Sequence, residues 1–208
     1  MAYIFDTAVN GRAAFAGKVY FFKDDKYVRY DWGQDMADSG PSPIGLWNVP
    51  APFLTGVDAA VNGAMQYQGK VYFFRGNQYV GYDWATGAVT GPSPLTAWNL
   101  PPAFASGIDS ALTGQGSYAG KAYFFKGNQY ITYDWATGAI SGPAPLSQWN
   151  LTGAFLKGVH SSVNGEGPYT GSAYFFRGPH YARYYWSNGA VGGPSHLSLW
   201  KLRGGVGS

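Results

Sequence analysis

The chain has 208 residues, a net charge of +3, 18% aromatic and 12% charged residues, and no cysteine. This composition supplies material for a packed core and argues against disorder. It excludes disulfides, thiolate nucleophiles and Cys-type zinc sites, and the 14 scattered Lys and Arg residues form no stripe that would neutralise a nucleic-acid backbone.

The first six residues, Met1 to Asp6, contain neither a basic start nor an apolar run of signal-peptide length. No later stretch approaches the roughly 18 apolar residues that a membrane span needs. We therefore expect a protein without a membrane span that is either cytoplasmic or exported by a leaderless route.

The chain repeats one unit four times. An aromatic run that begins at Lys18 returns at Lys70, Lys121 and Ser172, at offsets of 52, 51 and 51 residues. Each run is followed by Tyr-x-x-Tyr-x-Trp, a Gly-Pro pair that indicates a turn, and a second tryptophan. We expect one domain of four repeats, over residues 1–52, 53–103, 104–154 and 155–202, with a flexible tail over 203–208. The eight tryptophans form two fourfold sets, Trp32, Trp84, Trp135 and Trp186, and Trp47, Trp98, Trp149 and Trp200.

Each repeat contains a predicted β-hairpin, in which a pair of turn residues separates two short runs rich in Val, Ile, Tyr and Phe. Along the first run, Val19 and Phe21 face one way while Tyr20 and Phe22 face the other, so both faces are apolar. Such a strand must be covered on both sides, and a small sheet stacked between two neighbouring sheets meets that need. The repeats therefore predict an all-β fold, a four-bladed β-propeller.

The innermost strand of each blade is expected just before the aromatic run. The segments Thr7-Ala8-Val9 and Ala59-Ala60-Val61 have small residues at their centres, which suits four strands that crowd around a narrow axis. At the other end of the chain, Leu199, Trp200 and Leu202 are expected to close the ring by packing on the first blade beside Phe5 and Phe21.

These elements together resemble hemopexin-like repeats. The second repeat carries the resemblance in Asp-Ala-Ala-Val from Asp58, Tyr-Phe-Phe-Arg-Gly-Asn-Gln-Tyr from Tyr72, Gly-Pro-Ser-Pro from Gly91, and the late Trp98. The likeness covers nearly the whole chain and is nearest in character to microbial or plant-albumin-type members. Because that family spans haem carriers, metalloproteinase exosite domains and seed albumins, the resemblance implies the fold and leaves the function open.

The resemblance also implies a cation in the central channel, held by backbone carbonyls at the start of each inner strand. Four carbonyl oxygens suit a hard cation such as calcium or sodium. The alternative is that the side chains at these positions cap turns. The positions are Asp6, Asp58, Asp109 and His160.

A second candidate site is the ring formed by Trp32, Trp84, Trp135 and Trp186. Indole faces at the rim of a propeller would stack on sugar rings and give several equivalent sites with high avidity. The alternative is that these indoles fill the space between adjacent blades. Next to them, Asp31, Asp83 and Asp134 either hydrogen-bond sugar hydroxyls or satisfy backbone amides where the third strand ends.

The fourth repeat departs from its siblings. It holds all three histidines, His160, His180 and His196, and Tyr185 stands where the other repeats have an aspartate. This asymmetry makes a unique ligand site in blade 4 a further hypothesis. A haem or metal site built from these histidines is the lesser alternative, because their separations of 20 and 16 residues match no compact zinc motif.

No nucleophile with its base, carboxylate pair or open metal site is visible as a local motif, so we expect a binding protein and not an enzyme. The leading hypothesis is a carbohydrate-binding, lectin-like propeller. The alternatives are a small-molecule or haem carrier that uses the channel mouth or blade 4, and a protein-interaction module. A glycan or small molecule is thus the expected partner, and the sequence does not indicate an oligomeric state.

Overall fold

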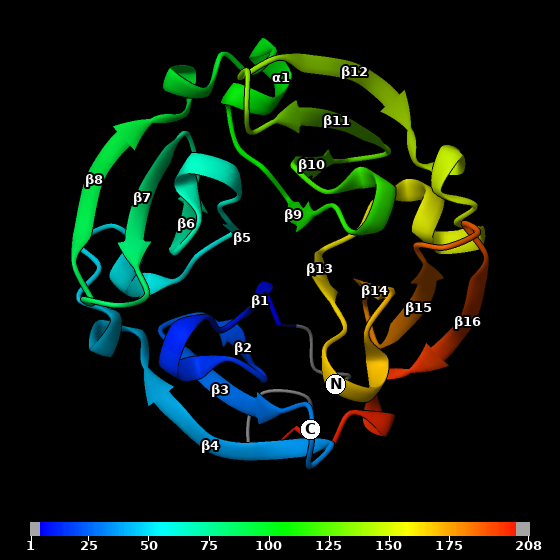
Figure 1. Cartoon of the computed structure of the whole chain (residues 1–208), viewed down its shortest axis with the longest axis horizontal. Helices are drawn as coiled ribbons and strands as arrows, with labels where there is room; N and C mark the ends of the chain where they lie inside the picture. Colours follow the sequence, from blue (N-terminus) through cyan, green and yellow to red (C-terminus); the bar gives the residue numbers. More distant parts are fainter. Residues whose placement is uncertain (1–4, 203–208) are drawn as a thin grey trace.

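The computed structural model describes residues 5–202. Within that range, sixteen strands form four separate four-stranded antiparallel sheets. The sheets stand around a central axis like the blades of a propeller, each with its first strand nearest the axis (Figure 1). The predicted all-β, four-bladed architecture is therefore confirmed, and the predicted tail over 203–208 lies outside the described residues.

The four strands of each blade follow one another in chain order from the axis outward. Blade 1 contains β1 (Thr7–Asn10), β2 (Lys18–Lys23), β3 (Lys26–Asp31) and β4 (Met36–Pro43). Blade 2 contains β5 (Ala59–Asn62), β6 (Lys70–Arg75), β7 (Gln78–Asp83) and β8 (Val89–Pro94). Blade 3 contains β9 (Ser110–Thr113), β10 (Lys121–Lys126), β11 (Gln129–Asp134) and β12 (Ile140–Pro145). Blade 4 contains β13 (Ser161–Asn164), β14 (Ser172–Arg177), β15 (His180–Tyr185) and β16 (Val191–His196).

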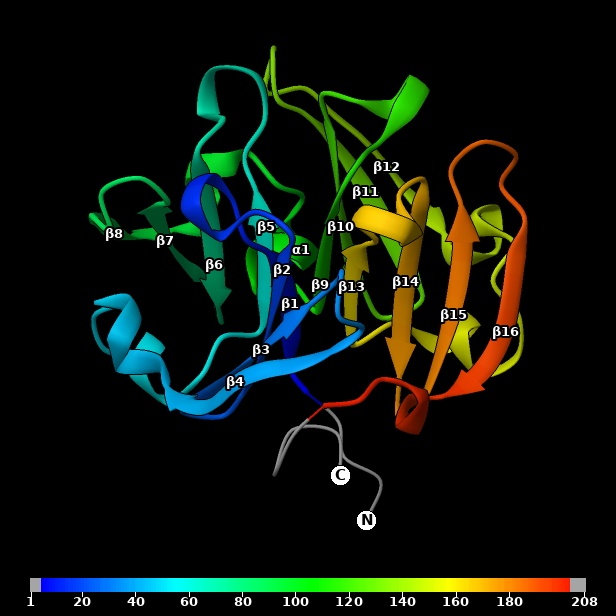
Figure 2. The ribbon, with the colours of Figure 1, turned by 60° about the horizontal axis from the view of Figure 1, so that its bottom comes forward.

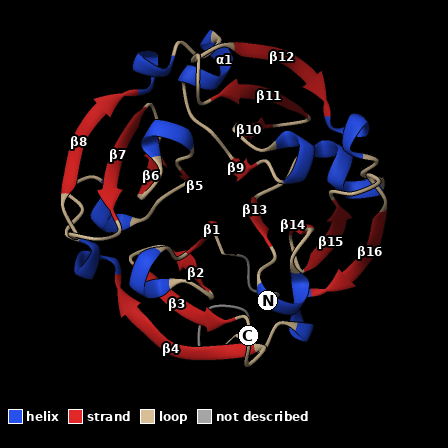
Figure 3. Ribbon diagram, in the orientation of Figure 1, coloured by secondary structure: helices blue, strands red, loops and turns tan. Residues whose placement is uncertain are grey.

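Helical structure is confined to short turns that connect the strands (Figure 3). One 3-10 turn follows the first strand of each blade, at Ala13–Phe15, Met65–Tyr67, Gly116–Tyr118 and Gly167–Tyr169. Another follows the fourth strand, at Ile44–Trp47, Leu95–Trp98, Leu146–Trp149 and Leu197–Leu199. Further turns lie at Phe53–Thr55 and Gly153–Lys157, and α1 spans Pro102–Ala105. Among residues 5–202, no helix combines the length and apolar character that crossing a membrane requires.

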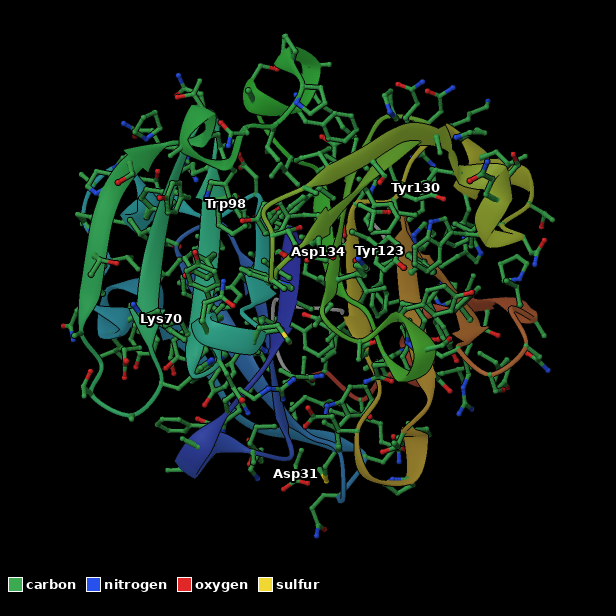
Figure 4. The ribbon with its side chains drawn as sticks, turned by 45° about the horizontal axis from the view of Figure 1, so that its top comes forward. Asp31, Lys70, Trp98, Tyr123, Tyr130 and Asp134 are labelled. Atoms are coloured by element: carbon green, nitrogen blue, oxygen red, sulfur yellow. The ribbon has the colours of Figure 1, made fainter. Side chains whose placement is uncertain are left out.

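The hydrophobic core consists of four clusters, each between two neighbouring blades. Val19 and Phe21 pack with residues of blade 4, while Tyr20 and Phe22 on the other face of β2 pack with residues of blade 2. The same alternation along β6 and β10 builds the clusters between blades 2 and 3 and between blades 3 and 4. Figure 4 shows side chains filling these interfaces. The sequence prediction that the aromatic strand is covered on both faces is confirmed.

The Gly-Pro pairs are not turns, contrary to the sequence prediction. Gly40 and Pro41 lie inside β4, and the equivalent pairs lie inside β8, β12 and β16, the outermost strands of the other blades. An outermost strand pairs on one side only, so it tolerates a proline that lacks an N–H group. Gly40 adopts φ +103°, and a Cβ there would lie 2.8 Å from the carbonyl oxygen of Tyr27, so the close approach of β3 to β4 requires glycine.

The ring closes at the interface between blade 4 and blade 1, which we call the seam. The backbone N–H of Ala37 in β4 donates to the carbonyl of Lys201. Trp200 and Leu202 pack into the cluster that contains Phe5 and Phe21, as expected. Leu199 does not, because it lies on the outer side of its turn with 62% of its surface exposed.

Candidate functional site

The first tryptophan set is buried, so the predicted ring of exposed indoles is wrong. Trp32, Trp84, Trp135 and Trp186 expose between 1% and 7% of their surface. Each indole lies between two blades; Trp32, for example, is 6.0 Å from the ring of Tyr174 in blade 4 and stacked on it. The alternative reading, in which these side chains fill the space between blades, is the one the structure supports.

The buried indoles have a structural partner at the axis. The Nε1 atoms of Trp32, Trp84 and Trp186 donate to the side-chain oxygens of Asn10, Asn62 and Asn164, at 2.8 to 2.9 Å. These asparagines end the inner strands. Their side-chain amides in turn donate to a carbonyl of the neighbouring blade.

The resulting hydrogen bonds form a closed ring around the channel. Asn62 donates to the carbonyl of Asn10, Asn10 to that of Asn164, and Asn164 to that of Thr113, while the hydroxyl of Thr113 donates to the carbonyl of Asn62. Thr113 stands in place of asparagine in blade 3, and its hydroxyl bonds to Asn62 and not to the indole of Trp135. Trp135 Nε1 is consequently buried without a hydrogen-bond partner.

We expect Thr113→Asn to stabilise the protein by about 1 kcal/mol, because an Asn oxygen would accept the orphaned N–H of Trp135. For a chain of this length, that gain raises the melting temperature by roughly 2–4 °C. Thermal and urea unfolding measure it. Thr113→Val removes the hydroxyl that takes part in the closed ring of hydrogen bonds and supplies no acceptor, so it should be less stable than the native protein. A Thr113→Asn variant no more stable than the native protein would contradict the prediction.

The aspartates beside the tryptophans cap turns. One carboxylate oxygen of Asp134 accepts from the amides of Ala136 and Thr137, and the other pairs with Lys121. The Lys121 ammonium and these amides lower the pKa of Asp134 to about 2. Asp31 and Asp83 accept from the equivalent amides of their own turns. The alternative reading of Asp31, Asp83 and Asp134 is therefore the one observed.

The predicted channel positions do come together. Asp6, Asp58, Asp109 and His160 line one hollow of about 570 Å³ at the end of the channel where β1 begins. Their side chains accept the backbone N–H groups of residues 24, 76, 127 and 178 in the hairpin turns. Among the described residues, no three acidic or histidine side chains gather as metal ligands, so a cation here would depend on backbone carbonyls.

Only two of the three histidines of blade 4 lie together. His180 and His196 pair across β15 and β16 with ring centroids 5.6 Å apart. His160 lies apart at the channel mouth, where burial lowers its pKa below the ordinary value. Tyr185 is partly exposed, and the guanidinium of Arg183 lies 4.9 Å from its ring centroid.

A third fourfold aromatic set, which the sequence reasoning missed, lies at the other end of the channel. Its members end the 3-10 turns that follow the inner strands, at the end opposite the start of β1 (Figure 2). Tyr67 and Tyr118 expose 37% and 43% of their surface, and Phe15 and Tyr169 are partly exposed. We call Phe15, Tyr67, Tyr118 and Tyr169 the rim aromatic residues. Their spacing of 52, 51 and 51 residues was the signal that could have identified them.

Each rim aromatic residue lies over a buried tryptophan of the next blade. The ring centroids of Tyr67 and Trp135, and those of Tyr118 and Trp186, are 5.6 Å apart. At the seam, Tyr169 and Trp32 are 5.7 Å apart. The buried indole therefore holds the rim ring in place, and the rim ring presents the aromatic surface to solvent.

The seam contains a cavity of about 210 Å³. Aromatic side chains from blades 1 and 4 form most of its wall, and Asp35 is its acidic group. The hydroxyls of Tyr30 and Tyr169 donate to the same carboxylate oxygen of Asp35, at 2.6 and 3.0 Å. The lining residues are Tyr30, Trp32, Asp35, Tyr169, Tyr174, Tyr181, Leu199 and Trp200.

Comparison with known proteins supports the fold. A family model described as Hemopexin matches residues 5–51, the first blade. The hemopexin fold protein CP4 from cow pea superposes with a TM-score of 0.78 at 24% sequence identity over 96% of each chain. A Cicer arietinum albumin described as showing hemagglutination superposes with a TM-score of 0.78 at 22% identity over 95% of each chain. A Cicer arietinum lectin described as having two metal binding sites gives a TM-score of 0.78 at 23% identity over 95% of each chain. No curated protein sequence matches the chain significantly.

Proposed function

Because the chain is a hemopexin-like four-bladed propeller, we propose that it is a non-enzymatic, lectin-like protein that binds carbohydrate at the rim of its channel. The observation that carries this proposal is the fourfold set of rim aromatic residues. Tyr67 and Tyr118 combine an exposed ring with a hydroxyl, and this pairing of an apolar face and a polar tip suits the C–H face and hydroxyls of a sugar.

Repetition favours binding of a branched or clustered glycan. Four similar rings around one axis offer weak sites in a fixed arrangement, and simultaneous occupation raises the avidity above that of any single site. A protein of the same fold, the Cicer arietinum albumin, is described as showing hemagglutination, which is a multivalent effect. That description supports the same class of activity for this chain.

The experiment is a glycan array together with haemagglutination, comparing the native protein with the double variant Tyr67→Ala, Tyr118→Ala. We expect the native protein to bind and the double variant to lose at least about tenfold in avidity, because two of four rim sites are removed. Tyr185→Ala is the matched control, since Tyr185 is similarly exposed at 36% but lies at the end of β15. Silence of the folded native protein across the array, or loss of binding only in the control, would contradict the proposal.

We further propose that a hard cation, calcium or sodium, occupies the central channel. The four predicted positions surround one end of the channel. Farther along, the channel holds a space of about 20 Å³ that is lined by the inner strands from Ala8 to Asn10 and their equivalents, and by Arg12. That space exceeds the roughly 10–15 Å³ needed by one water-sized occupant. The lectin with two metal binding sites provides a precedent within this fold.

A small-molecule carrier is the second candidate function, favoured by the 570 Å³ hollow at the channel mouth. Its lining includes Lys23, Lys126 and His160 as well as three aspartates. This mixed charge suits a polar ligand better than the apolar face of a haem.

A further inference from the structure

The seam cavity contains an acidic residue where the other blades have glycine. Asp35 occupies the position of Gly87, Gly138 and Gly189, which adopt φ values of +71°, +72° and +70°. Asp35 itself has φ +53°, a left-handed conformation that costs an L-residue energy and that aspartate tolerates better than most. The carboxylate therefore enters the seam cavity from a position that presents no side chain in the other three blades.

The Asp35 carboxylate remains available to a ligand. One oxygen accepts from Tyr30 and Tyr169, and the other lies 3.4 Å from the Lys201 ammonium. The side chain is still 42% exposed, and an ionised carboxylate has about four acceptor positions. Although burial opposes ionisation, the Tyr30, Tyr169 and Lys201 contacts hold the pKa of Asp35 below its ordinary value, so it is a pure acceptor at neutral pH.

The remaining wall is aromatic, with its polar atoms at the edges of rings. Trp32 and Trp200 meet at 5.4 Å, and Tyr30 and Trp200 at 5.4 Å, and these three side chains are 2–6% exposed, so they form the rigid floor beneath the cavity. The accessible part of the wall comes from Tyr169 and Tyr181, which are half-buried, and from the exposed Leu199. Tyr174 and Tyr181 also line the cavity. The cavity of about 210 Å³ is smaller than the roughly 300–1,000 Å³ typical of drug-sized ligands, so it suits a single ring.

The charge around the seam argues against a cationic ligand. Lys201 lies beside Asp35, and the guanidinium of Arg183 lies 5.7 Å from the ring centroids of both Tyr169 and Tyr174, which line the cavity. These two positive charges outnumber the single carboxylate of Asp35, so the seam does not favour a cationic ligand. A neutral ligand with several hydroxyl groups would instead donate to Asp35 and place its C–H face against the half-buried rings of Tyr169 and Tyr181.

We propose that the seam cavity is a binding site for one sugar ring, with Asp35 accepting hydrogen bonds from its hydroxyl groups. This site rests on the proposed carbohydrate-binding function and adds a single site whose acidic group has no counterpart side chain in the other three blades. It joins blade 1 to blade 4, so its ligand bridges the two ends of the propeller.

The test measures binding of free monosaccharides to the full chain by saturation-transfer NMR and tryptophan fluorescence, using glucose, galactose, mannose and N-acetylglucosamine. We expect at least one to bind with a Kd of about 1 mM or better. Asp35→Gly should weaken that binding at least tenfold. The Asp35→Gly variant should fold, because the other three blades have glycine at this position. Asp35→Asn fits the same backbone conformation but lacks the charge, so it should weaken binding as well.

Asp24→Gly is the matched control. Asp24 also has a left-handed φ, of +50°, at a position where the siblings have Gly76, Gly127 and Gly178, but it does not line the cavity. Its replacement should leave monosaccharide binding unchanged. Native-like binding by Asp35→Gly, or no binding of any of the four sugars by the native protein, would overturn the proposal.

The outcomes separate this site from the rim proposal. If the glycan array is silent while monosaccharides bind and Asp35→Gly abolishes the signal, the seam site stands and the multivalent lectin fails. If the array is positive and Asp35→Gly changes neither array nor monosaccharide binding, the lectin stands and the seam site fails.

Discussion

Trp200→Ala is expected to lower the free energy of unfolding by about 3–5 kcal/mol, among the largest effects for one substitution in this chain. Trp200 is the principal side chain that closes the ring without a disulfide. It is 6% exposed and contacts Phe21 of blade 1 at 5.5 Å and Phe176 of blade 4 at 5.3 Å. Its removal opens a void between blades that share no other covalent link than the chain itself.

Urea unfolding of the full chain measures this loss. The neighbouring Leu199 is 62% exposed, so Leu199→Ala should change stability by no more than about 0.5 kcal/mol. Comparing the two variants distinguishes the loss of a buried side chain at the seam from a general effect of substitutions in the last turn on stability. Equal stabilities of the two variants would show that the seam does not hold the propeller closed.

Asn62→Ala is expected to cost about 2–4 kcal/mol, because it breaks two links of the axial network at once. It leaves the buried Nε1 of Trp84 without an acceptor and the carbonyl of Asn10 without its donor. Trp84 and Asn10 are both buried, so each polar atom loses its partner inside the protein, where an unpaired polar group is costly.

Asn62→Thr provides the comparison, because threonine is the native residue at the equivalent position in blade 3. Its hydroxyl should keep the bond to the next carbonyl, as Thr113 does, and lose only the indole contact. We expect about half the cost of the alanine variant in urea unfolding. A stability for Asn62→Ala within about 0.5 kcal/mol of the native protein would show that the axial network contributes little.

The axial network also explains the buried tryptophans in energetic terms. An indole that packs between blades and donates to Asn10 or Asn62 links the third strand to the axis in a single contact. The set has four tryptophans because each of the four interfaces between neighbouring blades contains one.

The sequence determined the propeller because its information is local and periodic. Alternation along Val19, Tyr20, Phe21 and Phe22 sets which face meets which neighbour, and a repeat of 51 residues sets how often a blade recurs. Side chains alternate in any strand, so the two faces of the strand can be assigned without knowing which residues of the neighbouring blade they contact.

Which aromatic residue meets solvent was decided only by the tertiary structure. The sequence alone does not show whether Trp32 or Tyr169 is exposed to solvent. The packing of blade 4 on blade 1 buries Trp32 beneath Tyr169. The seam cavity arises in the same way, since Asp35 meets Tyr169 across 134 residues of chain. Side-chain exposure and cavity formation depend on contacts between blades. The repeat pattern within one blade carries no information about these contacts.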